Sequence, residues 1–289
     1  MSSFPPTHLT VAYLDRALST LSNISGTGWE AGNPVSNLQT TRLEEASTLS
    51  TSSANITLDL GSTLVSDMFC IVRHSLSPGS TWRVRTSNDV VLLTDPDSIP
   101  GNVIFDSGTI EVWPDTDDYS SIPYAEYTSW AQGVSYLYNP PAAIYAPSGS
   151  SARYVYIDIV GTSGEEVAKL FIGPYWLPSN GVSANWSISY QPLAKPTRLH
   201  GSTVITRDLP QYRQLTFSCK YLTETDTFEH SAIIDREFRV NKPYLACINP
   251  SNPNSYRTLV YGANTKVLVT KNSGFQGFYS KAFKIEEWL

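Results

Sequence analysis

The chain has 289 residues, of which 41% are hydrophobic and only 16% charged, and its net charge at pH 7 is −6. This length allows one large domain or two of medium size. The acidic balance, without any run of basic residues, argues against nucleic-acid binding, because phosphate contacts need clustered Lys and Arg. No apolar run approaches the roughly 20 residues that span a bilayer, so we expect no membrane insertion.

The cysteine pattern points to a reducing compartment. Cys70, Cys219 and Cys247 show no C-x-x-C spacing, and two of them lie inside the apolar runs MFCIV and YLACI. Isolated cysteines of this kind are usually buried free thiols. The opening residues MSSFPPTHLT have neither a charged n-region nor an apolar h-region, so we expect no signal peptide and synthesis in the cytoplasm.

The residues from 55 to 89 predict the strands around which the first domain is built. Ile56, Leu58 and Leu60 alternate with polar residues, which is the period of a half-buried strand. The run from Met68 to Val72 is continuously apolar and predicts a strand buried on both faces. Turn residues separate these runs, and ARYVYIDIV repeats the alternation near residue 155. The pattern predicts a β-sandwich.

Trp82 and Val84 alternate with Arg83 and Arg85, so both guanidinium groups should share the sheet face opposite Trp82. Two interpretations of this arginine pair stay open. The arginines belong either to a solvated outer sheet face or to an interface at which they meet a partner's carboxylates.

The residues that follow are less regular. The run VVLLT at 90–94 predicts a further strand. Residues 113–150 lose any strand period and predict a long loop. This loop is rich in aromatic residues, which sugar rings and protein partners both stack against. The candidate contact residues are Trp113, Tyr119, Tyr124, Tyr127, Trp130, Tyr136 and Tyr138. They could pack on the chain's own sandwich or a neighbouring copy, contact a different protein, or bind a glycan.

Two prolines in QPLAKP mark a junction, from which we predict a sandwich domain over residues 1–190 and a smaller β-rich α+β domain over 191–289. The second domain contains several strand patterns and one helical stripe over 224–239. Thr223 and Asp226 resemble a capping box at the start of that helix, with Asp in place of Glu.

No motif for catalysis or for a cofactor is present. His8, His74, His200 and His230 are far apart and fit no zinc-binding frame, and His74 is expected at the rim of the sandwich, satisfied by backbone groups. The acidic pairs at 165–166 and 286–287 are adjacent, so within a strand each pair would face opposite sides. We therefore predict no enzyme, no cofactor and no metal. The cluster Asp115, Asp117 and Asp118 is more typical of a solvated loop than of a cation site.

The ordered motifs resemble a family of tailed-phage minor tail and tail-tip proteins. The motifs are WEAGNPVSNLQTTRLEE, then ITLDLG to STWRVRTSND, IFDSG with VWPD, ARYVYIDI and LFIGPYWLPSNG, covering about residues 28–181. In that family a galactose-binding-like (discoidin-like) jelly-roll opens the chain. The last hundred residues, ending in YSKAFKIEEWL, resemble more loosely the β-rich ring-forming domain of distal tail proteins.

The resemblance implies a mainly β protein, with a galactose-binding-like jelly-roll sandwich first and a ring-forming domain with one helix second. It implies a structural virion protein of the tail tip or baseplate, made in the host cytoplasm. Its expected partners are further copies in a ring, with a hexamer favoured over a trimer, and the tail tube, hub and fibre proteins. The alternative is a carbohydrate-binding module that adheres to glycans on the host surface.

Overall fold

The computed structural model describes residues 8–18, 22–97, 102–113, 141–183, 185–192, 197–198, 204–205, 211–238, 240–266, 268–272 and 277–288. The chain divides into two compact units. The first comprises residues 1–177 and 244–259, and the second comprises residues 178–243 and 260–289. The first unit therefore includes a segment that returns to it late in the sequence.

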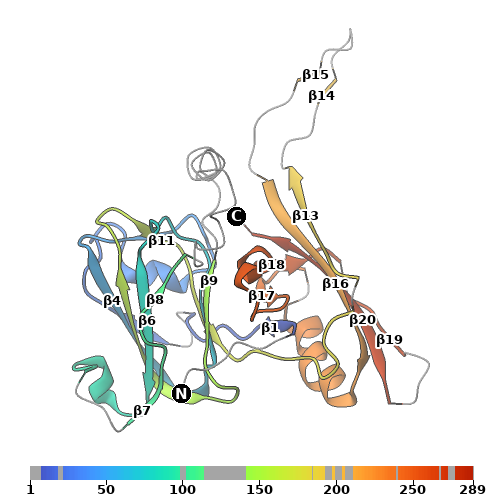
Figure 1. The fold of residues 1–289 in the computed structure, drawn as a ribbon, viewed down its shortest axis with the longest axis horizontal. Helices are drawn as coiled ribbons and strands as arrows, with labels where there is room; N and C mark the ends of the chain where they lie inside the picture. The colour runs from blue at the N-terminus through green and yellow to red at the C-terminus, as the bar shows by residue number, and fades with distance from the viewer. Residues whose placement is uncertain are drawn as a thin grey trace. The chain divides into compact units, whose positions relative to one another are not determined.

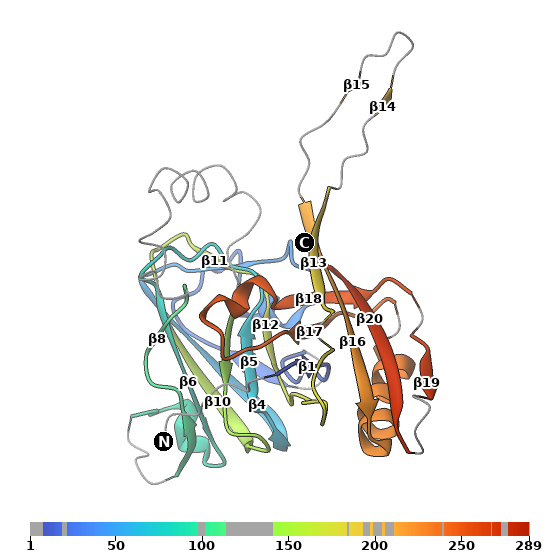
Figure 2. The same cartoon turned by 45° about the vertical axis from the view of Figure 1, so that its right-hand side comes forward.

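The first unit is an antiparallel β-sandwich. Its larger sheet has the strand order β2-β4-β10-β6-β7, with β8 also pairing with β6, and its smaller sheet has the order β12-β5-β9. Strands β4, β6, β7, β8 and β9 are labelled in Figure 1, and β5, β10 and β12 in Figure 2. The bounds of the larger sheet are β2 Asn23–Ser25, β4 Ser53–Val65, β6 Thr81–Ser87, β7 Val103–Asp106, β8 Ile110–Glu111 and β10 Ser151–Val160. The smaller sheet consists of β5 Met68–Ile71, β9 Ala142–Tyr145 and β12 Leu170–Gly173.

Alternating side chains from the larger sheet and apolar side chains from the smaller sheet fill the space between them. Ile56 and Leu58 of β4, Trp82 of β6 and Ile157 of β10 are at most 1% exposed. They belong to one hydrophobic core with residues of the smaller sheet. All four residues of β5 are buried, as predicted for a strand covered on both faces. Two short pairs complete this unit: β1 Thr10–Ala12 with β17 Tyr244–Cys247, and β3 Ser47–Thr48 with β11 Glu166–Val167.

The second unit is a smaller antiparallel sheet with a helix against it (Figure 2). Its strands follow the order β18-β20-β16-β13, and β19 also pairs with β20. Their bounds are β13 Ser187–Pro192, β16 Gln211–Leu222, β18 Val260–Asn264, β19 Thr270–Asn272 and β20 Tyr279–Glu287. The short strands β14 Thr197–Arg198 and β15 Val204–Ile205 pair with each other. Phe217 of β16 and Phe283 of β20 stack at 4.8 Å in the core of this sheet.

The predicted helix is confirmed over residues 224–238. The capping box is confirmed as well, because the Asp226 backbone N–H donates to Thr223 Oγ1 and the Thr223 N–H donates to Asp226 Oδ2. Much of the helix is wound as π-helical turns, at Asp226–Ser231 and Ile234–Phe238. The buried Lys281 of β20 fixes the helix to the sheet by donating to Ser231 Oγ and Asp235 Oδ2.

Two predictions from local pattern were wrong. Residues 90–94 do not form a strand: Val90–Leu93 is a 3₁₀ turn, η2, capped by the Asp89 side chain, which accepts from the Val91 N–H. Only Leu92 of this apolar run is buried. Residues 113–150 do not form a continuous loop, because β9 pairs with β5 through Ala142–Tyr145.

The fold class is the predicted one: mainly β, with a sandwich first and a β-rich unit second, and with one helix of several turns in the described ranges. None of the helices in these ranges combines the length and the apolar character that crossing a membrane requires.

Replacing Trp82 with Ala tests the inner face of β6. The indole is 1% exposed in the sandwich core, so we expect the variant to lose roughly 3–5 kcal/mol of unfolding free energy in urea. Trp186→Ala, at a tryptophan that is 40% exposed, is the matched control and should change stability far less. Near-wild-type unfolding of Trp82→Ala would show that the inner face of β6 is assigned wrongly.

Candidate functional site

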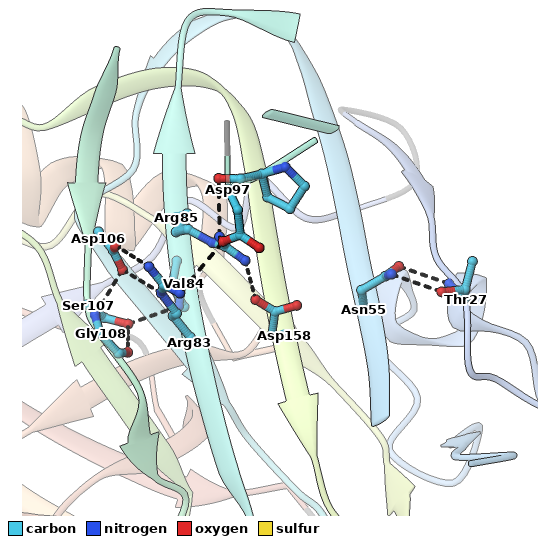
Figure 3. A network of polar contacts seen from close by, with 11 residues as sticks. Thr27, Asn55, Arg83, Val84, Arg85, Asp97, Asp106, Ser107, Gly108 and Asp158 are labelled. Carbon is cyan, nitrogen blue, oxygen red and sulfur yellow. Dashed lines mark hydrogen bonds and ion pairs between the residues drawn. The ribbon is translucent and has the colours of Figure 1, made fainter. Parts of the chain in front are cut away.

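The arginine pair of β6 lies on the outer face of the larger sheet, as the alternation predicted. In the antiparallel register, Arg85 is opposite Tyr156 and Arg83 is opposite Asp158, both on β10. Figure 3 shows Arg83, Arg85 and Asp158 together on this face. Trp82 and Val84 point to the other side, into the core. Strand β6 therefore contributes apolar side chains to the core and polar side chains to the outer face.

Arg85 is 3% exposed although it lies on the outer face. Its Nη2 donates to Asp158 Oδ2 at 2.5 Å, and its Nη1 donates to Asp97 Oδ1 at 2.5 Å and to the Pro96 carbonyl at 3.1 Å. The guanidinium lies 5.0 Å from the centre of the Tyr156 ring, a cation–π distance. The segment around η2 covers this part of the face, because Leu92 packs with Tyr154 and Tyr156.

Arg83 makes a two-point ion pair with Asp106 of β7. Its Nε donates to Oδ1 at 2.9 Å and its Nη2 donates to Oδ2 at 2.6 Å (Figure 3). The hydrogen bonds from Arg83 lower the pKa of Asp106 below its ordinary value. The prediction of a solvated outer face is wrong for Arg85, which is buried, whereas Arg83 remains partly exposed. Both arginines pair with carboxylates of their own chain, and contact with a partner stays a prediction.

The same face continues across β10 to β4 with further internal pairs. Arg153 donates to both carboxylate oxygens of Asp59, at 2.8 and 2.9 Å, and its guanidinium lies 4.9 Å from the Tyr154 ring. The hydrogen bonds from Arg153 lower the pKa of Asp59. Asn55 exchanges two hydrogen bonds with Thr27, visible at the edge of Figure 3. The charged side chains of the outer face are therefore held in place by ion pairs with one another, and their charges are neutralised within the chain.

Trp113, the first residue of the aromatic segment, lies at the rim of the sandwich. Trp113 donates its indole N–H to the Leu76 carbonyl at 2.7 Å, and its ring meets that of His74 edge to face at 6.3 Å. Trp113 also packs on the core of the sandwich. The other candidates, Tyr119, Tyr124, Tyr127, Trp130, Tyr136 and Tyr138, lie outside the described residues, as do Asp115, Asp117 and Asp118.

Glu165 braces this rim, a role that sequence reasoning missed. Its carboxylate accepts from the Ser77 N–H at 2.9 Å and from the Thr162 N–H at 2.8 Å, so it ties together two loops 88 residues apart. A side chain at Gly161 would collide with the Glu165 carboxylate. The turn GTSGE offered a local signal, because a carboxylate three residues after Thr162 can return to its backbone.

The thiols are buried and free of disulfides, as predicted. Burial raises the pKa of Cys219 to about 12 and also raises the pKa of Cys70, so both remain protonated and unreactive at neutral pH. Among the described residues, no group of three or more His, Cys, Asp and Glu side chains is placed to hold a metal ion.

Exposed aromatic side chains gather in the second unit. The large aromatic residues that stand exposed in the described ranges all belong to it: Trp186, Tyr190, Tyr221, Phe228 and Phe278. Phe228 is 61% exposed and meets the Tyr279 ring edge to face at 5.4 Å, and Tyr221 meets Phe278 at 6.3 Å. Exposed aromatic side chains are enriched at protein contact surfaces.

No protein-family model matches the chain, and no curated protein matches it. Solved structures with which it shares a similarity include a GH29 fucosidase from Ruminococcus gnavus in complex with fucose, at 11% identity and TM-score 0.37. That match covers 56% of this chain and 26% of the fucosidase chain. A Streptococcus pneumoniae fucose binding module matches at 11% identity and TM-score 0.35, over 56% of this chain and 99% of the module.

A family 32 carbohydrate-binding module from C. perfringens, in complex with galactose, matches at 12% identity and TM-score 0.35. That match covers 58% of this chain and 99% of the module. These structures are mostly carbohydrate-binding domains. Similarity at this level carries no assignment of function to the present chain.

Replacing Arg85 with Ala tests how much its ion pairs with Asp97 and Asp158 stabilise the protein. The change removes a buried guanidinium and leaves Asp158 without its ion-pair partner, so we expect a loss of about 2–4 kcal/mol in chemical unfolding. Arg42→Ala is the matched control, because the Arg42–Glu45 pair is exposed and its loss should change the unfolding free energy far less. Equal effects of the two substitutions would contradict a structural role for Arg85.

Proposed function

We propose that this protein is a non-catalytic assembly protein, a structural subunit of a phage tail tip whose second unit provides the surface for contacts with copies and neighbours. The observation that carries the proposal is that the exposed large aromatic side chains of the described residues all belong to that unit. Water-exposed rings are costly for a monomer and are covered when subunits associate. The low charge of the chain, 16%, adds little repulsion between copies.

The state of the ionisable groups supports a role without bond-making chemistry. The arginines of the outer face are each paired with carboxylates, and Arg213 and Glu287 form a further buried pair in the second unit. A general base or nucleophile must be able to reach a substrate and change its protonation state, which groups tied in buried pairs do poorly. The buried thiols are likewise held protonated.

The tail assignment itself rests on the sequence resemblance. The motifs in the first 181 residues keep the order found in tail-tip proteins, and YSKAFKIEEWL contains the whole of β20, a central strand of the second unit. On this proposal the second unit joins copies into a ring, with six copies favoured. The sandwich lies on the outside of the ring and contacts the tail tube, hub or fibre proteins.

Immunogold labelling of virions tests this role. We expect antibodies against the purified chain to label the tail tips of particles from the phage that encodes it, with none on the heads. Label on the host envelope, or on no part of the virion, would contradict a structural role in the tail.

Carbohydrate binding is a second candidate, favoured by the position of Trp113. This residue fixes the start of an aromatic-rich segment at the rim of the sandwich, braced by its indole hydrogen bond and by Glu165. Aromatic side chains suit stacking against sugar faces, and the sequence that follows Trp113 is rich in them. The glycan would be a component of the host surface.

A glycan array with the wild-type chain and Trp130→Ala separates the two candidates. If the sandwich binds sugar, the wild type should bind a defined set of glycans and the variant should lose that binding, because Trp130 lies within the aromatic segment. A Trp82→Phe variant with a native circular dichroism spectrum controls for loss of fold. No binding by the wild type across the array would end the carbohydrate proposal.

A further inference from the structure

Among the described strands of the second unit, β13 forms an exposed sheet edge without a charge. In this sheet β16 pairs with β13 on one side and with β20 on the other, and β18 and β19 both pair with the far side of β20. Every residue of β18 is buried, and Lys271 places a charge at the centre of β19. Within the described residues β13 pairs only with β16, so the backbone groups of its outer edge face away from the sheet (Figure 1).

Edge strands of soluble proteins commonly carry a charged residue or an interior proline that prevents pairing with another chain. Strand β13 has neither: its sequence, SISYQP, is uncharged, and the proline stands at the last position. Tyr190 is 54% exposed although it lies opposite the buried Arg213 of β16, and Trp186, directly before the strand, is 40% exposed. Another strand can therefore add to this edge.

The order of side chains along β13 makes the strand complementary to a second copy of itself. In an antiparallel pair centred on Ser189, Ile188 of each copy lies opposite Tyr190 of the other, on one face of the sheet. A β-branched side chain opposite an aromatic one is a favourable cross-strand pair. On the other face Ser189 lies opposite itself and Ser187 lies opposite Gln191, so polar groups meet polar groups and no like charges are opposed.

We propose that β13 of one copy pairs antiparallel with β13 of a second copy, across a two-fold axis at Ser189. The pairing joins the two sheets into one and covers Tyr190 in both copies. The same register, continued by one residue, brings Trp186 of each copy opposite Pro192 of the other. The inference goes beyond the proposed ring and does not depend on it, because a two-fold contact of this kind closes at two copies.

Disulfide cross-linking of variants with one added cysteine tests the pairing and its register. Ser189→Cys should give a linked dimer by itself on mild oxidation, because directly opposed Cα atoms of an antiparallel pair are about 4.5–5.5 Å apart, within reach of a disulfide. Ser187→Cys and Gln191→Cys should give a dimer when mixed and none when oxidised separately, because each added thiol is then about 13 Å along the strand from its own copy. The native cysteines are buried and do not compete.

Lys271→Cys is the matched control for cross-linking. It places an exposed thiol elsewhere on the same unit and should give no dimer under the same oxidation. A dimer from Lys271→Cys as readily as from Ser189→Cys, or a dimer from Ser187→Cys alone, would overturn the two-fold register centred on Ser189.

Ser189→Lys tests the contact without a cross-link. It would place two like charges directly opposite each other, so we expect the dissociation constant of the dimer in sedimentation equilibrium to rise at least about fivefold. Ser189→Thr is the matched neutral control and should keep the dimer. A native circular dichroism spectrum of each variant controls for loss of fold.

The outcomes separate this contact from the proposed ring. Multimers in light scattering that neither cross-link through Ser189→Cys nor respond to Ser189→Lys would overturn the β13 contact and leave assembly through another surface standing. A cross-linked dimer without larger species would support the β13 contact and contradict the ring. Monomers alone, without cross-links, would overturn both.

Discussion

The period-two alternation of β6 is the constraint on which the sandwich depends. Its inward residues, Trp82 and Val84, close the hydrophobic core, and its outward residues, Arg83 and Arg85, hold the outer face together. A slip of one residue in the pairing with β10 would move both guanidinium groups into the core and the indole into water. The register of this strand therefore determines both which residues fill the core and which ion pairs form on the outer face.

The parts of the fold that could be predicted from the sequence are those with a local physical signal. The burial of Trp82 follows from alternation, the burial of β5 from a continuous apolar run, and the start of the helix from the Thr223–Asp226 box. The partners of Arg85 could not be predicted, because Asp97 and Asp158 are 12 and 73 residues away and meet it only through sheet register. The apolar run at 90–94 misled because the Asp89 cap, a single side-chain hydrogen bond, favours a 3₁₀ turn over a strand. The return of residues 244–259 to the first unit has no sequence signal.

Both units bury aromatic residues in their cores, but among the described residues only the second unit also has large aromatic side chains that are exposed. In the sandwich, Trp82 and Phe69 are buried in the core, and Tyr156 is buried beside Arg85. In the second unit, Phe228 and Tyr190 are among the most exposed large side chains. The sandwich is therefore a packed unit in which the charged side chains of the outer face pair with one another. The second unit leaves apolar side chains exposed among the described residues, and on this ground we propose assembly for the second unit and recognition for the rim of the first.

Native mass spectrometry of the purified chain tests most directly whether these surfaces join copies of the protein. Assembly through the second unit predicts ions at whole-number multiples of 31.9 kDa, with one closed oligomer dominant as concentration rises. A single species at 31.9 kDa at every concentration would contradict the proposal that the exposed aromatic side chains join copies of the protein.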